Sequence, residues 1–456
     1  MARTRGGGRL GLGLLVAAAV ASAPLACSLL TSYSGLTAQA DAGDAGSLDA
    51  KRPDTGLADT TGQPGQDTGP REAGPACDAG KTACAQGCVD LTTDPASCGR
   101  CGRDCMGGAC TMGTCEALTL ASGQSTPGAI IVVSDALYWG NANEIMRCAL
   151  PAEAVIVDSG VADSDLADAD ADADLVDADA DLADAGIDAS EPDGGVLAAT
   201  CGASVTSYRS TPSGALSAFA TEGARLFWLD NVNLWSCALG ATCPAETPLV
   251  VPITRYAPPV AAGRGLQLVA GASALYWPGP GGIEACSLGG CNFMSEFAQS
   301  GTSGIALADA TAYWGAGPSV TDCVATSTSC PAAMALLAVP GATAAFYLAT
   351  DGTTVYWTEQ AADGGVRSCP VSGCTTPAVV AASQATPTLI AADRSGVYWI
   401  NTGTPPAIMA CPPGGACPSP TVLWTGAYTP AGLAVDARAV YFTLPGASTV
   451  MAVAKL

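Results

Sequence analysis

The sequence predicts an all-β fold, a seven-bladed propeller of four-stranded antiparallel blades that follows a small disulfide-rich module. Two repeated features predict the propeller. The first is a pair of aromatic residues at the end of a short apolar run, which occurs seven times: Tyr138-Trp139, Phe227-Trp228, Tyr276-Trp277, Tyr313-Trp314, Tyr356-Trp357, Tyr398-Trp399 and Tyr441-Phe442. Between the second aromatics the intervals are 89, 49, 37, 43, 42 and 43 residues. Such a period is typical of propeller blades, so seven pairs indicate seven blades, with six or eight as alternatives.

The second feature is a cysteine at a fixed distance after the aromatic pair, nine residues in four copies and 12 in the next two. In five copies another cysteine follows within five to seven residues. Residues that flank a tight hairpin face each other at a distance that a disulfide can span. We therefore expect six disulfides in the propeller: Cys148–Cys201, Cys237–Cys243, Cys286–Cys291, Cys323–Cys330, Cys369–Cys374 and Cys411–Cys417.

One copy of the repeat contains four short strand signals in order. They are Leu389–Ala392, Val397–Ile400, Ile408–Cys411 and Thr421–Trp424, with turn residues rich in Gly, Pro and Asp between them. None of these segments has helical periodicity, and their composition is typical of strands. The pattern predicts one four-stranded antiparallel blade, with the aromatic pair on its second strand and the disulfide at the hairpin between strands three and four.

The first and last copies of the repeat predict how the ring closes. Ala117–Ala121 resembles a fourth strand without the three strands that should precede it. The last copy has the opposite pattern, since its third-strand segment Val450–Val453 has no fourth strand after it and Val453 replaces the cysteine. Pairing of these two segments would complete the seventh blade and leave no open sheet edge.

The formal charge of −23 is concentrated in an insert within the first copy. Residues 158–193 contain 14 acids and no base, and we expect residues 153–197 to be a disordered acidic insert within the propeller of residues 117–456. The alternation Asp168–Asp174 is similar to a calcium loop, but Ala173 stands where an EF-hand loop needs Gly. No basic patch is present, so we expect no nucleic-acid partner. No phosphate loop, metal-ligand cluster or dinucleotide fingerprint is evident, so we expect no cofactor.

The N-terminal segment reads as an export signal. Arg3, Arg5 and Arg9 precede an apolar stretch, and residues 1–26 are predicted to be a signal peptide. Ala21–Ala23 suits ordinary signal peptidase, whereas Leu25-Ala26-Cys27 resembles a bacterial lipobox, which implies lipidation of Cys27. That resemblance, with Ser28 after the cysteine, implies a lipid anchor in the outer membrane of a Gram-negative bacterium, on its periplasmic or surface face. Residues 27–75 are expected to be a disordered tether.

Residues 76–116 form a separate cysteine-rich module. About 40 residues cannot bury an adequate core, and an even number of cysteines in an exported chain indicates four disulfides, whose connectivity stays open. The spacing of Cys98 and Cys101 also suits a zinc site, which is the alternative. The segments Cys88–Leu91 and Cys98–Gly102 resemble cysteine-rich modules of surface lipoproteins in myxobacteria and related deltaproteobacteria. That resemblance implies a cellular location and no particular activity.

The aromatic pairs are interpreted as packing residues, with one side chain directed toward each neighbouring blade. The segment Val355–Glu359 resembles the YWTD repeat of receptor-type propellers, a family whose members have six blades. An acid precedes most pairs: Asp135, Glu222, Asp309, Asp351, Asp393 and Asp436. We interpret these acids as acceptors of backbone hydrogen bonds in turns, and a ring that binds a cation or a sugar is the alternative.

The sequence favours a non-catalytic role. It contains no histidine, which excludes histidine-based catalysis and histidine metal ligands, and no catalytic or phosphate-binding motif is evident. We expect a monomeric envelope lipoprotein whose propeller recognises a protein or a glycan. The alternatives are a carbohydrate-active enzyme that uses two carboxylates and a passive surface spacer. Two close acids in the central channel would favour the enzyme, and a channel of Ser, Thr and Gly would favour the binding protein.

Overall fold

The protein is described here by a computed structural model, in which the chain divides into two units, Met1–Pro70 and Arg71–Leu456. All described residues belong to the second unit. They are residues 77–150, 201, 205–210, 216–230, 233–240, 242–243, 267–279, 282–288, 291, 295–298, 304–316, 319–325, 328, 330, 334–338, 345–360 and 364–456. The predicted signal peptide 1–26, the lipidation site Cys27, the tether 27–75 and the acidic insert 153–197 lie outside the described residues.

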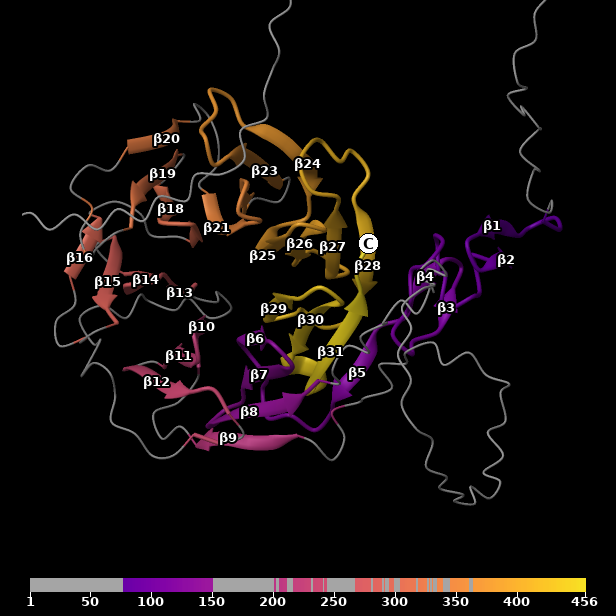
Figure 1. Cartoon of the computed structure of the whole chain (residues 1–456), viewed down its shortest axis with the longest axis horizontal. Coiled ribbons are helices and arrows are strands. Elements are labelled where there is room, and N and C mark those ends of the chain that lie inside the picture. Colours follow the sequence, from indigo (N-terminus) through magenta and orange to yellow (C-terminus); the bar gives the residue numbers. More distant parts are fainter. Residues whose placement is uncertain are drawn as a thin grey trace, which may run out of the picture. The chain divides into compact units, whose positions relative to one another are not determined.

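Seven antiparallel sheets stand around a common centre (Figure 1). Blade 1 consists of β6 (Ile130–Val133), β7 (Ala136–Gly140), β8 (Glu144–Ala149) and β9 (Thr206–Ser210). Blade 2 consists of β10 (Ala218–Glu222), β11 (Arg225–Leu229) and β12 (Leu234–Ala238). Blade 3 consists of β13 (Val269–Ala270), β14 (Ala274–Pro278), β15 (Ile283–Ser287) and β16 (Ser295–Ala298). Blade 4 consists of β17 (Ile305–Ala308), β18 (Thr311–Ala316), β19 (Ser319–Val324) and β20 (Met334–Ala338). Blade 5 consists of β21 (Ala345–Thr350), β22 (Thr354–Glu359), β23 (Gly364–Pro370) and β24 (Ala378–Gln384).

Blade 6 consists of β25 (Pro387–Asp393), β26 (Gly396–Asn401), β27 (Ala407–Cys411) and β28 (Thr421–Thr425). Blade 7 consists of β29 (Gly432–Val435), β30 (Ala439–Leu444), β31 (Thr449–Ala454) and β5 (Leu118–Ala121). Among the described residues, blade 2 has three strands and the other six blades have four. The 3₁₀ helix η3 (Pro445–Ala447) lies between β30 and β31. The predicted seven-bladed, all-β architecture is confirmed, and the count of seven departs from the six blades of the YWTD family.

The ring closes through the pairing that the sequence predicts. Strand β5 is the outer strand of blade 7 and pairs antiparallel with β31, with Val450 opposite Ala121 and Ala452 opposite Leu118. The first strand of the propeller therefore completes the blade formed by the last three. Backbone hydrogen bonds between β5 and β31 join the two ends of the repeat region. Strand β31 is therefore not left as an unpaired sheet edge.

The aromatic pairs fill seven hydrophobic cores, one between each two neighbouring blades. The core between blades 1 and 2 contains Tyr138 and Trp228, and the core between blades 7 and 1 contains Tyr441 and Trp139. The remaining five cores follow the same rule: Phe227 with Trp277, Tyr276 with Trp314, Tyr313 with Trp357, Tyr356 with Trp399, and Tyr398 with Phe442. Adjacent residues of a strand point to opposite faces, so each pair serves two interfaces, as predicted.

The cysteine-rich module contains two small hairpins and four disulfides. The hairpins are β1 (Thr82–Cys84) with β2 (Gly87–Val89), and β3 (Cys110–Thr111) with β4 (Thr114–Cys115). The disulfides are Cys77–Cys88, Cys84–Cys101, Cys98–Cys110 and Cys105–Cys115. The Sγ atoms of Cys98, Cys105 and Cys115 lie within 4.8 Å of one another, but all three belong to disulfides, as does Cys101. The structure thus describes these sulfurs as oxidised pairs, in which they are not thiolate ligands for zinc.

Candidate functional site

The antiparallel order of the blades gives the propeller two different faces. The turns between strands one and two lie at the same end as the loops between strands three and four, and we call this end the disulfide face. The hairpins between strands two and three, such as 140–144, lie at the opposite end with the blade-to-blade connections, such as 122–129. We call this end the connection face.

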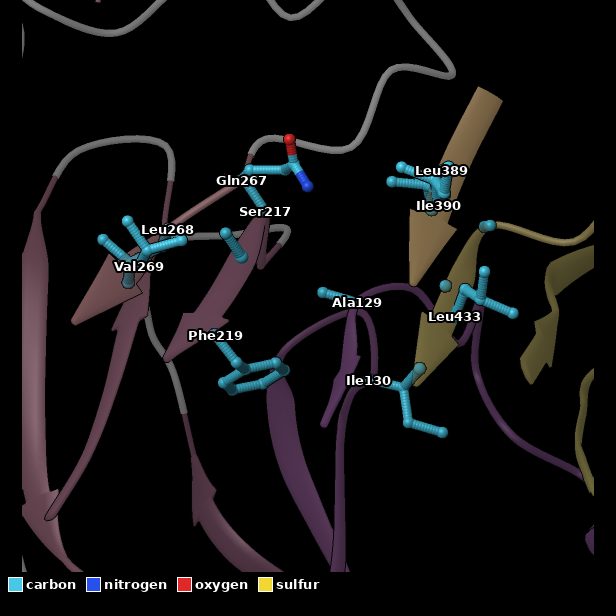
Figure 2. A pocket seen from close by; sticks show the side chains of 13 residues that line it. Ala129, Ile130, Ser217, Phe219, Gln267, Leu268, Val269, Leu389, Ile390 and Leu433 are labelled. Carbon is cyan, nitrogen blue, oxygen red and sulfur yellow. The ribbon is translucent and has the colours of Figure 1, made fainter. Parts of the chain in front are cut away.

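A hollow that is open to solvent lies at the centre of the connection face (Figure 2). Its walls are the beginnings of the inner strands β6, β10, β13, β25 and β29 and the residues just before them. Figure 2 shows Leu389, Ile390 and Leu433 on one side of the hollow and Phe219, Leu268 and Val269 on the other. It occupies the mouth of the central channel, the usual place for a binding site on a radial fold with loop-bearing ends.

The side chains that line the hollow are uncharged and mostly aliphatic, but polar atoms make up more of its accessible surface than apolar atoms do. Val269, Leu389 and Leu433 are partly exposed, whereas Phe219 and Ile390 are buried. None of the 13 lining residues carries a charge. The lining thus differs from both patterns considered for the sequence, since it is neither acidic nor made mainly of Ser, Thr and Gly. A group that enters this hollow meets aliphatic carbon and polar atoms together, and no charged side chain.

The lining has two polar side chains, Gln267 and Ser217, and both are hydrogen-bonded within the protein. The amide of Gln267 donates to the carbonyl of Leu348 (2.7 Å), and its oxygen accepts from the N–H groups of Leu348 and Ile305 (3.1 Å each). Gln267 therefore joins the inner end of blade 3 to blades 4 and 5. The hydroxyl of Ser217 donates to the carbonyl of Leu229 (3.4 Å). These two side chains therefore shape the hollow through bonds to the protein's own backbone.

A buried Gln–Trp–Asn arrangement fixes the connection face at two blades. In blade 1 the indole N–H of Trp139 and the amide of Asn141 both donate to the Gln124 oxygen, at 3.0 and 3.1 Å. Blade 6 repeats this with Trp399, Asn401 and Gln384 (3.3 and 2.9 Å). Each glutamine lies 15 residues before its tryptophan and each asparagine two residues after it. Sequence reasoning missed this motif, and its repeated spacing is the signal that could have found it.

The acids that precede the aromatic pairs act as turn acceptors in three blades. Asp351 Oδ1 accepts from the N–H groups of Thr353 and Thr354 (2.8 Å each). Asp393 and Asp436 make the same kind of contact, which confirms the turn interpretation for these blades. Burial raises the pKa of Asp351, but hydrogen bonds from Thr353, Thr354 and Tyr356 outweigh it, so the pKa is lowered overall. These carboxylates lie on the disulfide face, away from the hollow.

In six blades a disulfide joins a cysteine near the end of the third strand to a cysteine further along the chain. Cα–Cα distances are 5.2–6.0 Å, and the bonded pairs are Cys148–Cys201, Cys237–Cys243, Cys286–Cys291, Cys323–Cys330, Cys369–Cys374 and Cys411–Cys417. Each pair also packs in the core that its blade shares with the preceding blade. The disulfides therefore contribute to blade–blade packing as well as to their own hairpins.

The loops that the disulfides close reach back to the preceding blade. In four blades the second cysteine donates its backbone N–H to a carbonyl of the preceding blade's outer strand: Cys201 to Leu120 (2.7 Å), Cys243 to Tyr208 (3.0 Å), Cys330 to Phe297 (3.2 Å) and Cys417 to Val380 (2.7 Å). We call each of the six loops that a disulfide closes a clasp. Sequence reasoning placed each disulfide within one blade, and the contact with the preceding blade is visible only in the structure.

Tyrosines reinforce the clasps from the other side. The hydroxyl of Tyr138 donates to Gly240, that of Tyr276 to Ala325, and that of Tyr313 to Val371, at 3.2–3.3 Å. Each acceptor lies in the disulfide loop of the next blade. Burial raises the pKa of the Tyr276 and Tyr313 phenols, so both stay protonated donors.

The site and the fold define a disulfide-clasped, seven-bladed propeller with an uncharged hollow at one end of its channel. Of the described residues, none belongs to a helix able to span a bilayer. No family model matches the chain, and no curated protein matches it.

Solved structures resemble the chain at low identity. Virginiamycin B lyase from Staphylococcus aureus is 11% identical over 75% of this chain and 99% of its own, with a TM-score of 0.49. A computationally designed protein, Ika8, is 12% identical over 74% of this chain and 98% of its own, with a TM-score of 0.45. BamB from Moraxella catarrhalis is 9% identical over 72% and 84%, with a TM-score of 0.42. These similarities carry no argument about function.

Proposed function

We propose that this protein is a non-catalytic lipoprotein of the outer membrane whose propeller recognises a partner at the connection face. The observation that carries the proposal is the solvent-open hollow with partly exposed Val269, Leu389 and Leu433. Apolar side chains that stay exposed in a concave site are typical of binding surfaces. Clasps around the ring support the role, because a rigid framework loses little conformational entropy when it binds.

A protein partner is favoured over a glycan. Sugars present many hydroxyl groups, and a site for them needs free hydrogen-bonding side chains. Gln267 and Ser217 are instead bonded to backbone groups. A protein partner offers both apolar side chains, which would bury the exposed aliphatic carbon, and polar groups, which would meet the polar atoms of the hollow. Anchoring through Cys27 and the tether 27–75, which the sequence predicts, would hold the propeller near partners in the envelope.

The carbohydrate-active enzyme is the second candidate. Glycoside hydrolysis requires two carboxylates about 5–10 Å apart on either side of the sugar bond. The described lining of the hollow contributes no acid, and Asp351, Asp393 and Asp436 serve as turn acceptors on the other face. These observations favour recognition over hydrolysis.

The proposal is tested with the full-length protein and the variant Leu433→Lys, which places a charge in the hollow. Val422→Lys on the outer strand β28, 46% exposed, is the matched control. Both are screened against purified envelope proteins and a glycan array. We expect a protein ligand that binds wild type and Val422→Lys and loses at least tenfold affinity for Leu433→Lys. Binding that is insensitive to Leu433→Lys would contradict the assignment of the site.

A further inference from the structure

Blade 7 lacks the disulfide that the other blades have. Strand pairing sets the comparison: Cys411 lies opposite Val397 in blade 6, and Val453 lies opposite Val440 in blade 7. Val397 and Val440 both directly precede the aromatic pair of their blades. Val453 therefore stands where the first cysteine of a clasp would be. In addition, β5 pairs with β31 from the far side of the sequence, so no continuous loop joins the third and fourth strands of this blade.

Polar contacts of Lys455 join this end of blade 7 to blade 6. Its side chain is 6% exposed, and its ammonium forms an ion pair with Asp393 in the strand 1–2 turn of blade 6. The same ammonium donates to the carbonyl of Asp436 (2.7 Å) and lies 5.4 Å from the ring centre of Tyr398. Tyr398 is the counterpart of the tyrosines that contact clasps elsewhere, so Lys455 fills part of the vacant position.

The cysteine-rich module supplies the remaining contacts. The guanidinium of Arg103 donates to the carbonyls of Lys455 (2.8 Å) and Ala454 (3.4 Å), and Arg100 donates to the carbonyl of Leu456. Both arginines lie in the segment 98–105, which the disulfides of the module hold. Burial lowers the pKa of Arg103, as expected for a guanidinium enclosed between two parts of a fold.

Apolar packing joins the same two parts independently. Cys98, Cys105, Cys110 and Cys115 are buried in one core with Leu120 of β5 and with the clasp of blade 1. The module thus contacts both strands that close the ring, β31 through Arg103 and β5 through this core.

We infer that the cysteine-rich module is the seventh clasp of the propeller. It takes the place of the missing disulfide loop by holding both closing strands of blade 7, while Lys455 makes the contact with blade 6. The β5–β31 pairing that closes the ring depends on it. Loss of the contacts between the module and blade 7 loosens the ring at this one place and leaves the other blades intact. The inference stands independently of the proposed function.

Amide hydrogen exchange on the full-length protein tests this, with Arg103→Ala compared with Arg394→Ala, an arginine in an exposed turn of blade 6. We expect at least tenfold faster exchange in β5 and β31 for Arg103→Ala, with β21 to β28 unchanged, and no change for Arg394→Ala. Unchanged exchange in β5 and β31, or an equal rise in all blades, would overturn the inference. If Arg103→Ala does not fold, Arg103→Met is measured instead, which removes the donors and keeps an extended side chain. Wild-type exchange of β5 and β31 in that variant overturns it as well.

Discussion

The phenol oxygen of Tyr356 accepts a 3.0 Å hydrogen bond from the backbone N–H of Gly414, 58 residues further along the chain. Tyr356 belongs to the second strand of blade 5, and Gly414 lies in the disulfide loop of blade 6. The same hydroxyl donates to Asp351 (3.0 Å) in the turn of its own blade. One phenol therefore connects a turn, a strand and the neighbouring clasp, which is how the aromatic repeat and the cysteine repeat act together.

Replacement of Tyr356 by Phe should destabilise the propeller by about 1–3 kcal/mol, because Gly414 loses its acceptor and Asp351 loses a donor. The change in unfolding free energy is measured by urea denaturation. Tyr428→Phe, at a residue that is 50% exposed, is the control and should have little effect. Equal stability of the two variants would show that the Tyr356 hydroxyl contributes nothing.

Removal of one clasp disulfide should cost more than its loop entropy predicts. For Cys411→Ala with Cys417→Ala, the chain-entropy estimate for so short a loop is about 2 kcal/mol. The released loop also loses the bond from Cys417 to Val380 of blade 5. We expect a total loss above that estimate by urea denaturation, and faster amide exchange at both ends of the blade 5–6 interface. A loss confined to blade 6 would contradict the clasp.

The ion pair of Asp393 with Lys455 should make stability depend on acid pH. Burial raises the pKa of Asp393, but hydrogen bonds from Lys455 and Ser395 and the charge of Lys455 outweigh it, so the folded pKa lies below 3.8. A lowered folded pKa stabilises the protein at pH values above 3.8 and ceases to do so as the pH falls through the folded value. Unfolding free energies between pH 2 and 7 should thus fall less on acidification for Asp393→Asn than for wild type. Identical pH profiles would contradict this.

The two glutamines of the connection face should differ in importance. Gln124 accepts the indole hydrogen bond of Trp139, whereas Trp399 donates both to Gln384 and to Asn401 (3.1 Å). Replacing Gln124 by Ala deprives a buried donor of its acceptor and should cost about 1–3 kcal/mol. Gln384→Ala should cost less, because Trp399 retains Asn401. Thermal unfolding of the two variants in parallel checks this order.

The lipid anchor is tested by metabolic labelling. Cells that express the full-length chain should incorporate labelled palmitate into wild type and none into Cys27→Ala, and the variant should leave the membrane fraction. Cys27→Ser serves as a second variant, with the same expected outcome. Palmitate incorporation that persists without Cys27 would contradict a lipoprotein of this type.

The strands within one copy of the repeat could be predicted from the sequence. The strand signals of blade 6 match β25 to β28 to within two residues at each end, because each strand is a short apolar run bounded by turn residues. The closing role of Ala117–Ala121 was also predictable, since the repeat is one strand short at one end and has one to spare at the other. The lining of the hollow was not, because it combines the ends of five inner strands from distant parts of the chain.

By itself the sequence predicted seven blades, with six or eight as alternatives, and determined the strand that bears each aromatic pair and the spacing of the cysteines. These properties repeat with a period of about 43 residues and depend on contacts within one blade or between a blade and its equivalent copies. Only the tertiary structure showed that clasps contact the preceding blade, that Lys455 forms an ion pair with Asp393, and that Arg103 of the module donates a hydrogen bond just after the end of β31. Such contacts depend on the curvature of the closed ring, which sets distances between residues that no local pattern relates.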